Sequence, residues 1–308
     1  MDTQPVRRTP RTTPAPRADR EVRPYLESLG IPGITDLHVH FMPANVQEKV
    51  WAFFDAEADR GGPPWHIHYR QSEEDRVTTL RQIGVSAYAT LNYAHRPGMA
   101  AWLNDYSAGF AATHPDAIHS ATFYPEPGAQ DEVARSLDRG ARIFKVHVQV
   151  GGFTPLDPRL DRAWATVEEA GTPVVIHCGS GPHHGEFTGP DPIRELVARH
   201  PGLVLVIAHA GLPEYREFAE LAARQPNVYL DTTMVGTSYM QQTHPAPEDY
   251  PRTLAGLRDK VVLGSDFPSI PYSYSHQLEA LVDWGMDDDW MRSALWHTPR
   301  RLVGLPAD

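Results

Sequence analysis

The sequence contains eight short runs of β-branched and other apolar residues, bounded by glycine, proline or asparagine. The runs begin at Gly33, Val85, Ile118, Ala141, Thr172, Leu203, Val228 and Val261. Several are apolar on both faces, which is typical of strands buried in a parallel sheet. Their starts lie 23 to 33 residues apart, except for about 50 residues between the first two. This spacing leaves room for one helix between successive strands.

The segments between the runs carry helical patterns. Apolar residues recur there at three- or four-residue spacing, as in Val133 and Leu137 or Phe218 and Leu221. Eight strands alternating with helices, at about 30 residues per unit, predict a single-domain (β/α)8 TIM barrel, an α/β fold, over residues 24–308. A doubly wound sheet is the structural rival, but eight even repeats favour closure.

Two segments depart from the repeat. The long first interval predicts an insertion after the first strand, at about residues 41–72, on the face where barrel active sites lie. Residues 1–23 are rich in proline, threonine and arginine and almost free of large apolar side chains. Because such a segment cannot bury enough surface to offset its ordering entropy, we expect a disordered N-terminal tail.

The net charge and the cysteine content exclude some partners and some kinds of metal site. The net charge is −11, although the first 23 residues are basic, which argues against nucleic acid or an anionic membrane as partner. No apolar run is long enough to span a membrane, and we expect a cytoplasmic enzyme. The single cysteine excludes cysteine-rich metal sites, so any metal would be bound by some of the 16 histidines and by carboxylates.

Polar residues end several of the predicted strands. In a barrel these ends meet at one mouth, and they carry His38, His40, Lys145, His147, His177, His209 and Asp266. His38 and His40 are two residues apart, so both would point inward and could hold one ion. His177 and Asp266 would supply further ligands and leave one position open for water. Such a site lowers the pKa of water and polarises a carbonyl.

Four segments carry a family resemblance: DLHVHF, VVIHCGSG, IAHAG and GSDFP. Together they resemble the amidohydrolase superfamily, and within it the amidohydrolase-related family that includes aminocarboxymuconate-semialdehyde decarboxylase. The resemblance spans residues 33–304, and the ending Pro299–Leu305 fits it too. HxH alone is common, whereas the ordered set of HxH, histidine, histidine and aspartate on four strands is specific.

The resemblance implies a metal site and a catalytic pair. His38, His40, His177 and Asp266 would bind one divalent ion, Zn²⁺ first and Mn²⁺ second. His209 would act beside the metal without binding it, and Asp266 would also carry a proton. Binuclear relatives carbamylate a lysine at the place of Lys145, whereas mononuclear ones commonly keep Lys-x-His without that role. We favour substrate contact for Lys145 and His147.

The expected function is hydrolysis of a small lactone, amide or ester-like substrate, by water activated on the metal. The alternative is metal-dependent, non-oxidative decarboxylation of an unsaturated or aromatic carboxylic acid, because the same ligands serve both reactions. Arg96 is a further candidate for substrate binding, since a guanidinium grips a carboxylate bidentately. The expected partner is a small-molecule substrate; relatives are often dimers, so the resemblance also allows a homodimer, although the sequence itself does not fix the oligomeric state.

Overall fold

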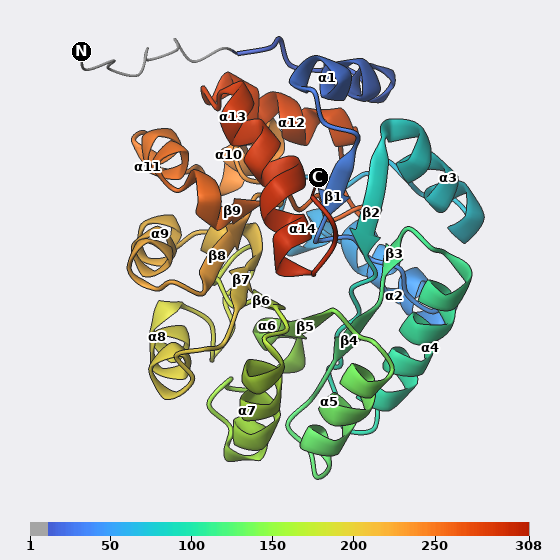
Figure 1. Ribbon diagram of the computed structural model, residues 1–308, viewed down its shortest axis with the longest axis vertical. Coiled ribbons are helices and arrows are strands. Elements are labelled where there is room, and N and C mark those ends of the chain that lie inside the picture. The colour runs from blue at the N-terminus through green and yellow to red at the C-terminus, as the bar shows by residue number, and fades with distance from the viewer. Residues whose placement is uncertain (1–11, 308) are drawn as a thin grey trace, which may run out of the picture.

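A closed barrel of short parallel strands forms the centre of the molecule (Figure 1). The computed structural model describes residues 12–307. Its strands are β1 (Ile34–Asp36), β2 (Val85–Ala89), β3 (Ala117–Ile118), β4 (Ser120–Thr122), β5 (Ile143–His147), β6 (Val174–His177), β7 (Leu205–Ile207), β8 (Val228–Asp231) and β9 (Val261–Val262). Only His119 separates β3 from β4, so these two short strands together fill one of the eight strand positions of the barrel. The predicted α/β barrel is confirmed.

The barrel closes between the first and last strands, just beyond their regular parts. The backbone N–H of Leu37 donates to the carbonyl of Leu263 at 3.2 Å, and that of Asp266 donates to the carbonyl of His38 at 2.8 Å. The N–H of His40 donates to the carbonyl of Phe267, also at 2.8 Å. Closure therefore brings two segments more than 220 residues apart in sequence into direct contact.

Helices surround the barrel in sequence order (Figure 1). They are α1 (Val22–Leu29), α2 (Ala44–Asp55), α3 (Glu73–Ile83), α4 (Ala100–Thr113), α5 (Ala129–Asp138), α6 (Val148–Gly151), α7 (Asp161–Ala170), α8 (Pro190–Arg199), α9 (Tyr215–Arg224), α10 (Ser238–Thr243), α11 (Tyr250–Gly256), α12 (Tyr274–Asp283), α13 (Asp288–Arg292) and α14 (Thr298–Leu302). None of the described helices has the length and apolar character that crossing a membrane requires.

The strands separate two apolar cores. Alternate residues of one strand enter different cores: Val175 packs inside the barrel, and Ile176 packs outward against the helices. Val303, which follows α14, joins the inner core. The guanidinium of Arg300 on α14 donates to Thr35 at the start of β1. Helix α14 therefore covers the N-terminal ends of the strands, and the opposite end of the barrel is left for the site.

The predicted insertion, residues 41–72, contains α2 and a 3-10 turn at Ala58–Arg60. The chain then runs without further helix to α3. In Figure 1, α2 lies behind the strands and α14 lies in front of them. Helix α2 thus stands at the C-terminal end of the barrel.

The prediction of a disordered tail is wrong for residues 12–23; residues 1–11 lie outside the described part. Helix α1 begins at Val22, inside the predicted tail, and Val22 is fully buried. The N–H and hydroxyl of Thr13 both donate to Asp288 at the start of α13. Asp19 accepts the N–H of Ser275 on α12 at 2.9 Å and the hydroxyl of Tyr69. A few polar contacts order this segment without an apolar pattern.

We predict that Asp19→Ala lowers the stability of the fold. The substitution leaves the N–H of Ser275 and the hydroxyl of Tyr69 without their acceptor, and both residues are buried. The expected loss is roughly 1–3 kcal/mol in chemical denaturation. Asp138→Ala, at an exposed acid on α5, is the matched control and should stay within about 0.5 kcal/mol of the parent. Equal stability of the two variants would mean that the segment does not dock.

Candidate metal centre

Three side chains converge at the C-terminal end of the barrel. Each of His38, His40 and Asp266 offers a ligand atom, and these atoms lie within 4.8 Å of one another. The Oδ1 atom of Asp266 is 2.9 Å from Nε2 of His40 and 3.7 Å from Nε2 of His38. Asp266 reaches this position from a left-handed backbone conformation, with φ of 65°. Such a φ is uncommon outside glycine and is often found at functional sites.

Asp231, at the end of β8, orients the ring of His38. Its Oδ2 atom is 2.8 Å from Nδ1 of His38, and the hydroxyl of Thr233 is 3.0 Å from the same nitrogen. The other oxygen of Asp231 accepts the backbone N–H groups of His209 and Thr233. A proton on Nδ1 of His38 leaves Nε2 with its lone pair toward the site. This carboxylate–histidine arrangement is the usual support of a metal-binding histidine.

His40 is fixed in the same way by a different acceptor. Its Nδ1 donates to the backbone carbonyl of Leu91 at 2.9 Å, so its Nε2 faces Asp266. Burial, and then the positive charge of Lys145, lower the pKa of His38 to about 4. Burial raises the pKa of Asp266, but its hydrogen bond to His40 and the charges of the neighbouring histidines outweigh this and hold that pKa below its usual range. His38 is thus neutral and Asp266 ionised, the forms that bind a metal.

His177 lies beside this set rather than within it. Its Nε2 is 3.1 Å from the carbonyl oxygen of Gly181. Its ring stacks on His147 at 4.0 Å between centroids and meets the edge of His209 at 4.8 Å. Burial lowers the pKa values of His177 and His147 well below the usual histidine value, so both rings are neutral.

His209 faces the same space from the turn after β7. Its ring centroid is 5.2 Å from that of His38. Its backbone has φ of 55°, and its N–H is held by Asp231. Nδ1 of His209 is buried and has no hydrogen-bond partner among the described residues. A buried, unpaired ring nitrogen is available to a ligand.

Lys145 is the one cation buried in this group of described residues. Its side chain is 1% exposed, and its Nζ donates to Nε2 of His38 at 3.0 Å. Burial lowers the pKa of Lys145 to about 8, although Asp231 and Asp266 oppose that shift. A metal on Nε2 of His38 would replace this hydrogen bond and leave the amine free for another acceptor.

Arg96 does not join the group. It is exposed on the loop after β2, next to the exposed His95. The charges of Arg96 and of Lys49 on α2 contribute, after burial, to lowering the pKa of His95. The strand-end position of Arg96 in the sequence therefore indicated the correct end of the barrel, and the structure places its side chain at the rim.

Sequence reasoning missed Asp231, Thr233 and two tyrosines. The ring of Tyr93 lies 4.9 Å from that of His147 and 5.9 Å from that of His40. The hydroxyl of Tyr272 is buried without a partner among the described residues. Burial and the charge of Asp266 raise the pKa of both phenols, which keeps them protonated donors. Both tyrosines follow strand ends, and no motif marks them.

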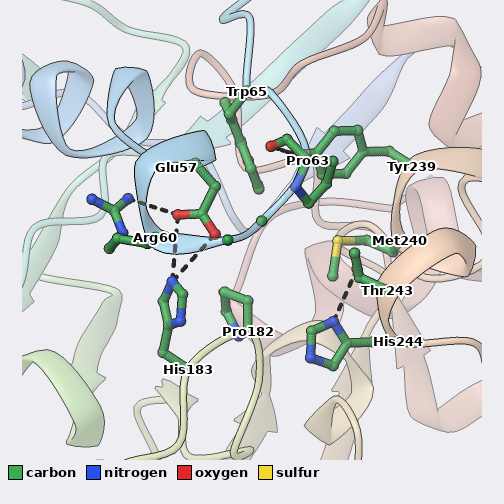
Figure 2. Close-up of a pocket in the computed structure, with 12 residues that line it drawn as sticks. Glu57, Arg60, Pro63, Trp65, Pro182, His183, Tyr239, Met240, Thr243 and His244 are labelled. Atoms are coloured by element: carbon green, nitrogen blue, oxygen red, sulfur yellow. Dashed lines mark hydrogen bonds and ion pairs between the residues drawn. The ribbon is translucent and has the colours of Figure 1, made fainter.

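A cavity of about 260 Å³ opens at the same end of the barrel (Figure 2). Residues from the loops after β1, β6 and β8 line it. Trp65 and Tyr239 form one side, and Glu57 contacts Arg60 and His183 on another (Figure 2). Pro182, also in its lining, follows Gly181, whose carbonyl contacts His177. We call this space the mouth cavity.

Comparison with known proteins identifies the family. The family model described as amidohydrolase matches residues 35–305, so the chain belongs to this family, whose members are metal-dependent enzymes. No curated protein matches the chain.

Solved structures share the fold. An uncharacterised TIM-barrel protein of Bordetella bronchiseptica is 21% identical with a TM-score of 0.70, over 88% of this chain and 98% of that one. A 5-carboxyvanillate decarboxylase of Sphingomonas paucimobilis and a probable 2-pyrone-4,6-dicarboxylic acid hydrolase of Acinetobacter baumannii are each 14% identical with a TM-score of 0.59. Each match covers 89% of this chain and 100% of the other. One fold thus carries two reaction types.

We predict that Asp231→Asn weakens metal binding by roughly 10–100-fold. The new amide would present N–H to Nδ1 of His38 or lose the contact, which favours a proton on Nε2, the atom needed for the metal. Competition titration against a coloured chelator measures the affinity.

Asp36→Asn is the matched control for this variant. Asp36 is an equally buried acid that accepts the backbone N–H of His38 rather than contacting its ring. We expect this variant to keep near-parental affinity, because the Oδ1 atom of an asparagine can still accept the N–H groups of His38 and Ser265 at the junction of the first and last strands. An unchanged affinity in Asp231→Asn, or an equal loss in both variants, would contradict the orienting role.

Proposed function

We propose that the protein is a metal-dependent hydrolase that acts on a carbonyl group of a small lactone, amide or ester-like substrate. The observation that carries the proposal is the convergence of the imidazoles of His38 and His40 with the carboxylate of Asp266, with the ring of His38 held by Asp231. These donors suit Zn²⁺, and Mn²⁺ is the second choice. His38, His40 and Asp266 would hold one ion, with His177 as the fourth ligand. A divalent ion supplies Lewis acidity and lowers the pKa of water.

The chain's own residues would then perform three tasks. The carboxylate of Asp266 accepts the proton of the attacking water, and the backbone N–H of the same residue, which donates to the carbonyl of His38, holds it in place. His209, whose Nδ1 has no partner within the described residues, places a hydrogen bond on the developing oxyanion. Lys145 and His147 contact the rest of the substrate, with the ring of Tyr93 beside that of His147.

Decarboxylation of an unsaturated or aromatic acid is the second candidate, and Lys145 is the observation that favours it. A buried amine beside the ligand set, with the neutral ring of His147 two residues on, could hold a carboxylate out of water. The phenols of Tyr93 and Tyr272 could supply a proton to carbon, since both stay protonated. The resemblance in fold to both a hydrolase and a decarboxylase fits either reaction.

One experiment separates the two functions. Purified protein, with its metal content measured, is assayed against lactones, amides, esters and aromatic carboxylic acids. Acid release and CO₂ release are recorded separately for each compound. We expect acid release that a strong chelator abolishes and that Zn²⁺ or Mn²⁺ restores. Chelator-sensitive CO₂ release without acid release would establish the alternative, and chelator-resistant turnover would refute both.

We predict that substitution distinguishes the residues that bind the metal from the residue that acts only in catalysis. His177→Asn and Asp266→Asn should lose much of the metal. His209→Asn should keep it and lose roughly 10²–10⁴-fold in turnover, the usual value of general acid–base assistance. His297→Asn, at an exposed histidine just before α14, is the control and should match the parent in both respects.

Metal stoichiometry by elemental analysis and single-substrate turnover are measured on the same preparations. Equal metal loss in the His209 and His177 variants would make His209 a ligand. Full metal retention in His177→Asn would remove it from the ligand set.

A further inference from the structure

A buried guanidinium lies between α2 and α3, away from the residues placed in the reaction. Arg76 on α3 is 4% exposed and forms no ion pair with a described residue. The one hydrogen bond that its guanidinium makes to the described residues runs from Nη1 to Oε1 of Gln47 on α2, at 2.7 Å. The guanidinium lies over the rings of Phe41 and Trp51, at 5.3 and 5.6 Å from their centroids.

Three donor nitrogens in and around this cation have no acceptor among the described residues. They are Nε of Arg76, Nε2 of Gln47 and Nε1 of Trp51, and all three atoms are buried. Gln47 and Trp51 are one turn apart on α2, so they share a face. The amide oxygen of Gln47 accepts from the guanidinium. The amide nitrogen of Gln47 therefore points elsewhere and needs a different acceptor. A buried donor without an acceptor costs about 1–3 kcal/mol.

The acid one turn before Arg76 on the same helix does not supply that acceptor. Glu73 precedes Arg76 by one turn of α3, and its carboxylate accepts the hydroxyl of Tyr106 instead. Burial lowers the pKa of Arg76, while Glu73 and Tyr106 raise it, and an arginine stays charged throughout. The cluster of Gln47, Trp51 and Arg76 therefore has one positive charge and three free donors.

We propose that this cluster binds a small monovalent inorganic anion of the chloride class. An anion would accept hydrogen bonds from all three nitrogens and neutralise the guanidinium, and it has no proton that needs an acceptor. A water molecule would bring two protons of its own, and the unpartnered atoms of these three residues are all donors. The aromatic walls of Phe41 and Trp51 strengthen the electrostatic attraction by excluding solvent.

Such an anion would connect α2 to α3. Gln47 is the one buried residue of α2, and Val46 and Phe54 of the same helix pack half-buried against the apolar cores, so a polar contact adds to the apolar packing of this helix. Helix α2 begins four residues after His40. Binding at the cluster would stabilise the segment that directly follows the metal ligands, and it does not depend on which reaction the enzyme catalyses.

The test is thermal unfolding of the full chain at constant ionic strength, with sodium gluconate replaced stepwise by sodium chloride. We expect a saturable rise in Tm of a few degrees, because a ligand that binds only the folded state raises its stability with concentration. A Tm independent of chloride would overturn the proposal and assign the donors to water.

A conservative variant keeps the test meaningful if removing Arg76 prevents folding. Gln47→Glu supplies a carboxylate to the guanidinium from the same position, so its Tm should no longer respond to chloride. Gln130→Glu, at an exposed position on α5, should respond like the parent. An undiminished chloride response in Gln47→Glu would place the anion elsewhere. In crystals grown with bromide, an anomalous peak beside Arg76 supports the site, and its absence there contradicts it.

Discussion

Closure of the barrel between its first and last strands is the constraint on which the site depends. The hydrogen bond from the N–H of Asp266 to the carbonyl of His38 joins the two segments that carry the converging ligands. Asp36 strengthens the junction, because its carboxylate accepts the N–H groups of His38 and Ser265 and the hydroxyl of Tyr274. With this junction open, His38 and His40 would have no carboxylate opposite them.

Asp231 adds the second layer of organisation. One carboxylate positions the ring of His38, the turn that carries His209 and the backbone of Thr233. Burial raises the pKa of Asp231, but the charge that His38 carries when protonated, its hydrogen bond to Asp231 and the charge of Lys145 outweigh burial and keep this pKa below its usual range. An ionised, fully buried acid in contact with three neighbouring segments explains how a set of histidines from separate strands keeps a common geometry.

The sequence predicted the fold because the barrel repeats one local pattern eight times. It predicted the strand ends of the site because inward and outward residues alternate, as at His38 and His40. It could not assign a role to Asp231, because the contact of Asp231 with His38 depends on which strand faces β1 across the interior of the barrel. Tyr93 and Tyr272 lie in loops without periodicity, and the N-terminal segment docks through single polar contacts such as those of Asp19. Local patterns do not encode such contacts.

A crystal structure of the Zn²⁺-loaded protein, with anomalous data at the zinc edge, tests the central claim most directly. We predict one strong peak per chain at about 2.0–2.2 Å from Nε2 of His38, Nε2 of His40 and a carboxylate oxygen of Asp266. Nδ1 of His38 should remain bonded to Asp231. A peak at another group of residues, or a second peak bridged to the first through a modified Lys145, would contradict the mononuclear centre.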